Sequence, residues 1–145
     1  MIETQRKDEA GALVDALAQT AFAVSAVLNR LASENGLSAT QLRALGILRD
    51  RRSRMSELAD YLGLDRSTLS GLMARAEKRG LVERAPNPED GRAVDVFLSV
   101  AGRELSVRLT AALEGALTPL VAGLGAGERK ELRELLERML RGSAL

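Results

Sequence analysis

The sequence predicts a mainly α-helical chain with one small β-hairpin. Three observations support this: apolar residues at helical spacing on both sides of a central segment, two valine-rich runs flanking a turn, and a composition suited to one compact domain. With 145 residues, 46% of them hydrophobic, the chain can bury a substantial core. We expect residues 1–145 to form a single domain.

The first expected helix runs from about Glu9 to Ser33. Its apolar residues recur at steps of three, four or seven, the spacing of one helix face: Leu13, Leu17, Val24, Leu28 and Leu31. Gly36 is expected to end this helix. Ser38, followed three residues later by Gln41, forms a capping-box pattern at the start of a second helix. That helix is expected to stop before a turn at residues 51–54.

The segment Met55–Gly80 is interpreted as two short helices joined by a tight turn. Ser56 and Asp65 are expected to cap the two helices, and Gly80 occupies the C-terminal stop position of the second. Gly63 permits the turn between them because it can adopt a positive φ. Leucines supply their shared core: Leu58, Leu62, Leu64, Leu69 and Leu72. This pattern is typical of a helix-turn-helix.

The second helix of this pair carries polar residues that could contact DNA. Its start and outer face present hydroxyls and cations suited to base edges and phosphates: Arg66, Ser67, Thr68, Ser70, Arg75 and Lys78. Asp65 is explained as the cap, and Glu77 is expected to pair along the helix. The alternative is an amphipathic helix with an ordinary solvated face.

Two valine-rich runs, Leu81–Arg84 and Ala93–Leu98, are predicted strands on either side of the turn-forming segment Pro86–Arg92. We expect this hairpin to be a wing that carries Arg92 into an adjacent minor groove, where narrow A·T-rich stretches attract arginine. Asp90 is interpreted as an internal partner that orients an arginine. A plain solvated turn is the alternative.

Two more helices are expected after the hairpin, from Ala101 to about Thr118 and from Glu128 to Leu140. Their apolar residues have helical spacing: Leu105, Leu109, Leu113, Leu117, Leu132, Leu135, Leu136, Met139 and Leu140. Pro119, with the glycines that follow it, is expected to mark the bend between them. A small DNA-binding module does not need three extra amphipathic helices. We therefore expect helices at about 9–35 and 101–142 to form a homodimer interface, with burial inside one subunit as the alternative.

Charge is distributed unevenly along the chain. The net charge is only +1, but residues 41–92 hold eleven basic and eight acidic side chains, and ten of the eleven are arginine. The planar guanidinium of arginine suits phosphate and minor-groove contacts. On charge alone, an ordinary solvated surface explains this excess equally well.

The residues that are missing exclude several kinds of chemistry. The sequence has no cysteine and no histidine, which removes thiol nucleophiles, zinc–thiolate sites, the usual general base and the commonest metal ligand. No phosphate-binding glycine loop is evident either. We predict that the chain is not an enzyme and has no metal site and no cofactor. With no 18-residue apolar run and no signal-peptide core, it is expected to be cytoplasmic, without a membrane segment.

Several segments resemble the MarR family of winged helix-turn-helix transcriptional regulators: Leu64–Ser70, Glu77–Arg84, Pro88–Ala93 and Ser99–Leu105. The similarity covers nearly the whole chain and is most specific from Leu58 to Leu105. It implies a mostly helical subunit with a DNA-binding lobe at about residues 38–100. It also implies a two-fold dimer formed by both chain ends, and repression of nearby genes.

The resemblance also implies roles for individual residues. Three positions match those that face the major groove in similar proteins: Ser67, Thr68 and Ser70. Arg92 matches the wing arginine that enters the minor groove, and Asp90 matches its acidic neighbour. Gly71 departs from the family pattern, which often has an arginine or another long polar side chain there, and this puts the sequence preference in doubt.

We therefore predict a sequence-specific regulator of double-stranded DNA, a repressor that binds an inverted repeat as a homodimer. Many MarR proteins release DNA when a small, often aromatic anion binds between the dimer helices and the DNA-binding lobe, and others respond to cysteine oxidation or to metal. Without cysteine and histidine, a small-molecule effector or no ligand remains. The alternative function is a protein-interaction module or an antagonist of another regulator, which predicts no salt-dependent DNA affinity.

Overall fold

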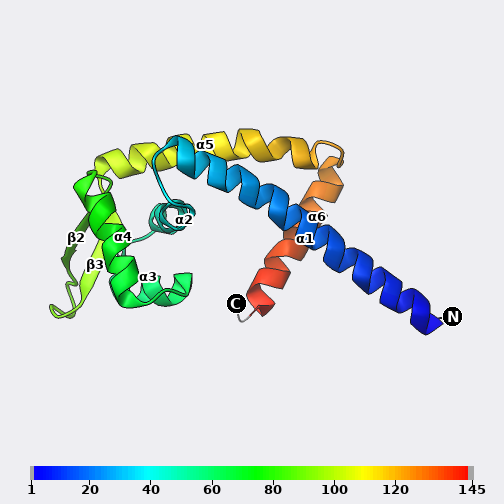
Figure 1. Cartoon of the computed structure of the whole chain (residues 1–145), viewed down its shortest axis with the longest axis horizontal. Coiled ribbons are helices and arrows are strands. Elements are labelled where there is room, and N and C mark those ends of the chain that lie inside the picture. Colours follow the sequence, from blue (N-terminus) through cyan, green and yellow to red (C-terminus); the bar gives the residue numbers. More distant parts are fainter. Residues whose placement is uncertain (1, 144–145) are drawn as a thin grey trace. The chain divides into compact units, whose positions relative to one another are not determined.

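The computed structural model describes residues 2–143, with side chains from residue 8 onward. Its contacts divide the chain into two compact units, Met1–Leu113 and Glu114–Leu145. The described residues form six helices and three short strands (Figure 1): α1 (Ile2–Glu34), α2 (Ala39–Leu48), β1 (Ser53–Arg54), α3 (Met55–Leu62), α4 (Arg66–Lys78), β2 (Val82–Pro86), β3 (Val94–Leu98), α5 (Val100–Val121) and α6 (Ala126–Gly142). The predicted mainly α fold with a small sheet is confirmed.

The residues that end α1 and begin α2 are those predicted from the sequence. Gly36 follows α1 with φ of 65°. Ser38 and Gln41 form the predicted capping box, in which the Gln41 N–H donates to Ser38 Oγ over 3.1 Å and the Ser38 N–H donates to Gln41 Oε1 over 3.0 Å. The start of α1 was predicted too late, at Glu9, whereas the helix begins at Ile2.

α3 and α4 form the predicted helix-turn-helix. Gly63 joins them with φ of 67°, in the left-handed region that favours glycine, and the Leu64 N–H donates to the Ala59 carbonyl over 2.9 Å. Asp65 caps α4 as expected, since its carboxylate accepts from the Thr68 N–H over 2.7 Å. The expectation that Ser56 caps α3 is wrong: the helix begins one residue before it, and no side chain caps that end.

The sheet has three strands in the order β1-β3-β2. β2 and β3 form the predicted hairpin, with Val82 opposite Leu98 and Pro86 opposite Val94. The segment expected to be a turn at residues 51–54 instead contributes β1, in which Ser53 pairs with Val96. The free edge of β3 explains this difference, because an open strand edge offers hydrogen bonds to any neighbouring extended segment.

The core of the first unit lies between α2, α4, the sheet and the start of α5. Its most deeply buried large side chains come from α2, α3, α4 and the sheet: Leu45, Leu48, Leu58, Leu69, Met73, Val82 and Val96. Because Leu69 and Met73 anchor the inner face of α4, the opposite face of that helix is directed outward.

α5 begins in close contact with the hairpin. Ser99 Oγ accepts from the Gly102 N–H over 3.0 Å and donates to the Gly80 carbonyl. A Cβ built on Gly102 would overlap the Leu81 carbonyl oxygen and lie 2.9 Å from the carbonyl carbon. Only glycine therefore fits here without a shift of the backbone.

The bend expected at Pro119 lies further along the chain, because α5 continues through this proline to Val121. Proline removes one N–H donor, which can kink a helix without ending it. In the second unit, the Gly125 N–H donates to Glu128 Oε1 over 2.9 Å at the start of α6. No residue of α6 is buried.

α1 is more apolar than the sequence analysis expected. Within Asp8–Glu34, an 18-residue stretch has a mean hydropathy of 1.6, so this helix has the length and the composition of one that could cross a membrane. The expectation that no such stretch exists is therefore corrected. One such helix is weak evidence for a membrane segment, because core and interface helices of soluble proteins have the same properties.

Candidate nucleic-acid interface

α4 presents a polar outer face. Leu69, Met73 and Ala76 are buried, whereas the predicted DNA-contacting residues other than Ser70 are exposed along this helix: Arg66, Ser67, Thr68, Arg75 and Lys78. Within this helix no acidic residue lies in the first turn. The face is therefore chemically suited to a duplex, which offers acceptor and donor groups on base edges and negative charge on its backbone.

The first turn of α4 is ordered by Asp65. Its carboxylate accepts from Ser67 Oγ over 2.7 Å and from Thr68 Oγ1 over 3.0 Å. These hydrogen bonds, that of Ser67 first, lower the pKa of Asp65 to about 2. Since both hydroxyls donate inward, their lone pairs point outward and can accept from amino groups of bases.

A different face of α4 is directed at the sheet. Glu77 accepts two hydrogen bonds from Arg84 on β2, over 3.2 and 2.9 Å, and this bonding lowers the pKa of the Glu77 carboxyl. The expectation that Glu77 pairs along its own helix is wrong. Ser70 is half-buried and lies two helical turns before Glu77, on the same face. Ser70 therefore faces the hairpin, unlike Ser67 and Thr68.

The tip of the wing holds its arginine beside an acid. Arg92 is 94% exposed, and its Nε lies 3.3 Å from Asp90 Oδ1. The Arg92 N–H donates to the same oxygen over 3.1 Å. Asn87 Oδ1 accepts from the N–H groups of Glu89 and Asp90 over 2.9 and 3.0 Å, which fixes the turn. The structure thus places Asp90 as a partner of Arg92.

A buried carboxylate, absent from the sequence predictions, fastens the base of the wing. The side chain of Asp95 is only 4% exposed and bonds to Arg52 Nε over 2.7 Å, and Asn87 donates to its two oxygens over 3.0 and 3.2 Å. Bonding by Asn87 and Arg52 lowers the pKa of Asp95. The Arg52 guanidinium also lies over the Phe97 ring, 4.6 Å from its centre. The sequence held one signal for this feature, because an acidic residue inside a valine-rich strand indicates a buried carboxylate that needs a partner.

A basic cavity of about 630 Å³, here called the arginine cavity, opens between the start of α4 and the wing. Ten residues line it: Arg54, Met55, Ser56, Arg66, Ser70, Arg84, Asp90, Arg92, Ala93 and Val94. The structure thus brings together four of the predicted site residues, Arg66, Ser70, Asp90 and Arg92. The other four are outside its lining. Arg54 and Arg84 are additions that sequence reasoning missed, although the arginine-rich run at 51–54 was a signal.

Gly71 leaves open space on α4, and Arg75 extends into it. A Cβ at position 71 would lie 3.7 Å from Arg75 Nη1, an ordinary contact distance. The Arg75 guanidinium, one turn later, therefore occupies space that a longer side chain at position 71 would fill.

The C-terminal end of α4 is tied to the end of α1. Arg79 donates through Nη1 to the Gly36 carbonyl over 2.8 Å and through Nη2 to the Asn35 carbonyl over 2.9 Å. Bidentate bonding of this kind restricts orientation as well as distance. The end of α1 and the end of α4 are thus held together by two hydrogen bonds from one side chain.

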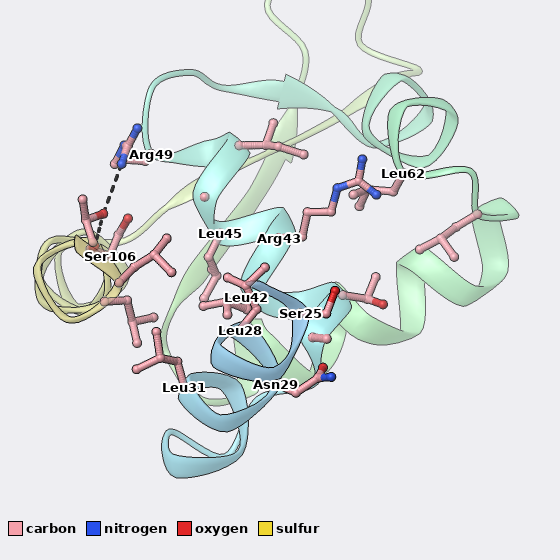
Figure 2. A pocket seen from close by; sticks show the side chains of 18 residues that line it. Ser25, Leu28, Asn29, Leu31, Leu42, Arg43, Leu45, Arg49, Leu62 and Ser106 are labelled. Atoms are coloured by element: carbon pink, nitrogen blue, oxygen red, sulfur yellow. Dashed lines mark hydrogen bonds between the residues drawn. The ribbon is translucent and has the colours of Figure 1, made fainter. Parts of the chain in front are cut away.

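A second cavity, of about 570 Å³, is mainly apolar and is here called the leucine cavity (Figure 2). Residues of α1, α2, α3, α5 and the turn after α3 line it, among them Leu28, Leu31, Leu42, Leu62 and Leu109. Arg43 and Arg49 are its only charged lining residues in the part of the chain that the structure describes, and Arg49 donates to Thr110 over 3.1 Å. None of its lining residues is aromatic.

Comparison with known proteins identifies the family. A sequence model of the MarR family matches residues 35–93. The transcriptional repressor NicR of Pseudomonas putida is 30% identical over 117 residues, which cover 80% of this chain and 74% of NicR. The chain belongs to the MarR family. It is a transcriptional regulator with a winged helix-turn-helix, and not an enzyme.

Solved structures agree with this assignment. A probable transcriptional regulator from Pseudomonas aeruginosa is 33% identical, with a TM-score of 0.68 over 85% of this chain and 92% of that one. A MarR variant from E. coli, solved in complex with operator DNA, is 28% identical, with a TM-score of 0.66 over 90% of this chain and 92% of MarR. The protein described here therefore shares its winged-helix fold with DNA-binding regulators.

Proposed function

We propose that this MarR-family protein is a cytoplasmic repressor that binds an inverted-repeat operator as a homodimer. The observation that supports DNA recognition most strongly is the combination, within one compact unit, of an outward polar face on α4 and an exposed wing arginine. A helix of this kind fits the major groove, and an arginine on a wing fits the adjacent minor groove. The related MarR variant was solved in complex with operator DNA, which supports DNA binding by this fold.

Each predicted site residue has a part in this proposal. Ser67 and Thr68 contact base edges at the start of α4, where Asp65 orients their hydroxyls. Arg75 and Lys78 contact phosphates from the later turns of the helix, which carry its basic residues. Arg92 enters the minor groove, and Asp90 limits its orientation. The roles of Arg66 and Ser70 depend on the arginine cavity.

Dimerisation by residues at about 9–35 and 101–142 explains why these helices leave large apolar side chains exposed. On α1, Leu13 is 70% exposed and Phe22 is 75% exposed. On α6, Leu140 is 75% exposed, and Met139 is 50% exposed. Amphipathic helices that leave such large apolar side chains exposed need a partner surface to cover them. The apolar composition of α1 has the same explanation.

Selection of bound sequences from random duplex DNA tests this function. Two α4 helices related by a two-fold axis enter successive major grooves about 34 to 36 Å apart. We therefore expect an enriched palindrome whose half-site centres lie about one helical turn apart. No enrichment, together with no affinity for any duplex at low salt, would reject DNA binding and favour the protein-interaction alternative.

The leucine cavity is the site we propose for a small-molecule effector. Its apolar walls with two arginines suit a mainly apolar molecule that carries an anionic group. α1 lines this cavity and is also tied to α4 through Arg79, so a ligand that displaces α1 changes the position of the recognition helix. Titration of small carboxylic acids should release operator DNA from the wild type but not from the Leu42→Trp variant, whose indole fills the cavity. Equal release from both proteins would place the effector elsewhere.

A further inference from the structure

The arginine cavity carries more positive charge than its internal partners neutralise. Arg84 is bonded to Glu77, and Arg92 is bonded to Asp90. The side chains of Arg54 and Arg66 make no hydrogen bond or ion pair with any residue whose side chain the structure describes. Asp95 has an electrostatic interaction with Arg54, but its carboxylate is already bonded to Arg52 and Asn87. Two cations therefore remain for a ligand.

The walls of the cavity also provide neutral donors. Ser56 and Ser70 line it from α3 and α4, and both are half-buried. A recessed hydroxyl next to guanidinium groups is poorly placed to reach a base edge, which requires a side chain that projects into the groove. Hydroxyls and arginines together are the donors that hold phosphate oxygens in protein–DNA complexes.

The position of the cavity indicates which phosphate this is. If α4 lies in the major groove and Arg92 enters the minor groove, one sugar–phosphate strand must pass between them, because that strand separates the two grooves. The arginine cavity occupies the space between the start of α4 and the wing. The strand thus passes over the cavity mouth.

We infer that the arginine cavity binds a backbone phosphate of this strand, with Arg54 and Arg66 as its cationic ligands and Ser70 as a hydroxyl donor. This inference rests on the proposed function and assigns Arg54 to the DNA site. It also changes the role of Ser70, which the family resemblance places among the base-reading residues. Here Ser70 contributes to affinity and not to sequence preference.

Salt dependence distinguishes a phosphate ligand from a base reader. Arg54→Gln and Arg66→Gln should each weaken binding to the selected duplex about tenfold. Each should also reduce the slope of log affinity against log salt by about 1 for each subunit. Arg51→Gln is the matched control: it removes an exposed arginine three residues before Arg54 that lies over the Tyr61 ring and outside the cavity lining, and it should leave both quantities unchanged. If affinity and slope were unchanged in both cavity variants while the wild type still bound DNA, the inference about the arginine cavity would be overturned. The proposed function would not be affected.

A duplex with single neutral methylphosphonates locates the phosphate. At one phosphate position in each half-site, the substitution should weaken binding of the wild type. At that position it should have little further effect on Arg54→Gln or Arg66→Gln, because these variants have already lost the charge pair. Equal sensitivity of the wild type and both variants at every position would contradict the assignment. Failure of the wild type to bind any duplex would instead reject the proposed function.

Ser70→Ala tests the change of role directly. Its affinity should fall by a similar factor for the selected duplex and for duplexes with one altered base pair, and repeated selection should return the same palindrome. A new preference at one position would show that Ser70 reads a base. Binding of inorganic phosphate to the DNA-free protein, lost in Arg54→Gln, would assign the cavity to a free anion and overturn the inference.

Discussion

The Gly102→Ala variant should lose about 3 kcal/mol or more of its free energy of unfolding, the largest effect we expect from a single methyl group in this protein. The added Cβ would overlap the Leu81 carbonyl oxygen and lie 2.9 Å from the carbonyl carbon. Backbone atoms cannot rotate away as a flexible side chain can. Either α5 or the start of the hairpin must move, at the expense of the hydrogen bonds through Ser99.

Gly46→Ala is the control, on α2 and outside the proposed dimer interface. Apart from the neighbouring residues and the backbone of its own helix, no described atom lies within 4 Å of a Cβ built at Gly46, so alanine should raise the free energy of unfolding by about 0.4 to 1 kcal/mol, because it restricts the unfolded chain. Urea denaturation measures both variants. Equal stability of the two would show that α5 does not approach the hairpin as closely as described.

Arg92→Ala should weaken operator binding about 10- to 100-fold, the range expected when a protein loses one good arginine contact worth ~1–3 kcal/mol. Its side chain is 94% exposed and, among the residues that the structure describes, is bonded to Asp90 alone, so we expect the variant to fold normally. Fluorescence anisotropy with the selected duplex and with altered duplexes should show a loss of affinity for most sequences, since a minor-groove arginine responds to groove width more than to individual bases.

Arg92→Lys separates charge from shape. Lysine keeps the positive charge but lacks the planar guanidinium, so the variant should bind more tightly than Arg92→Ala and more weakly than the wild type. The unfolding midpoints of all three proteins should agree. A wild-type affinity in Arg92→Ala would exclude the wing from the interface, although the assignment of α4 would stand.

Elements with a regular spacing of apolar residues, or with clear capping and turn residues, were predictable from the sequence. The leucine spacing indicated the helices, and the capping residues Ser38 and Asp65 marked two helix starts. Gly63 marked the turn between α3 and α4. In each of these cases a local rule of backbone chemistry decides the outcome, and the residues that satisfy it are adjacent in the sequence.

Features that depend on distant partners were not predictable. β1 has only two residues, too few for an alternating pattern, and exists because β3 has a free edge. The bonding of Asp95 to Arg52 joins residues 43 positions apart. For Ser70, the sequence indicated a polar position on α4 but not that this face is turned toward the wing, which the bond between Glu77 and Arg84 reveals.

The central claim is that a pair of α4 helices enters the duplex, and affinity cleavage tests it most directly. The chain has no cysteine, so Ser67→Cys provides a unique attachment point for an iron chelate at the start of α4. Two clusters of strand cleavage about one helical turn apart are expected within the selected palindrome, and none from a chelate at Ala101→Cys on α5. Cleavage without a preferred position, or equal cleavage from both sites, would contradict insertion of α4.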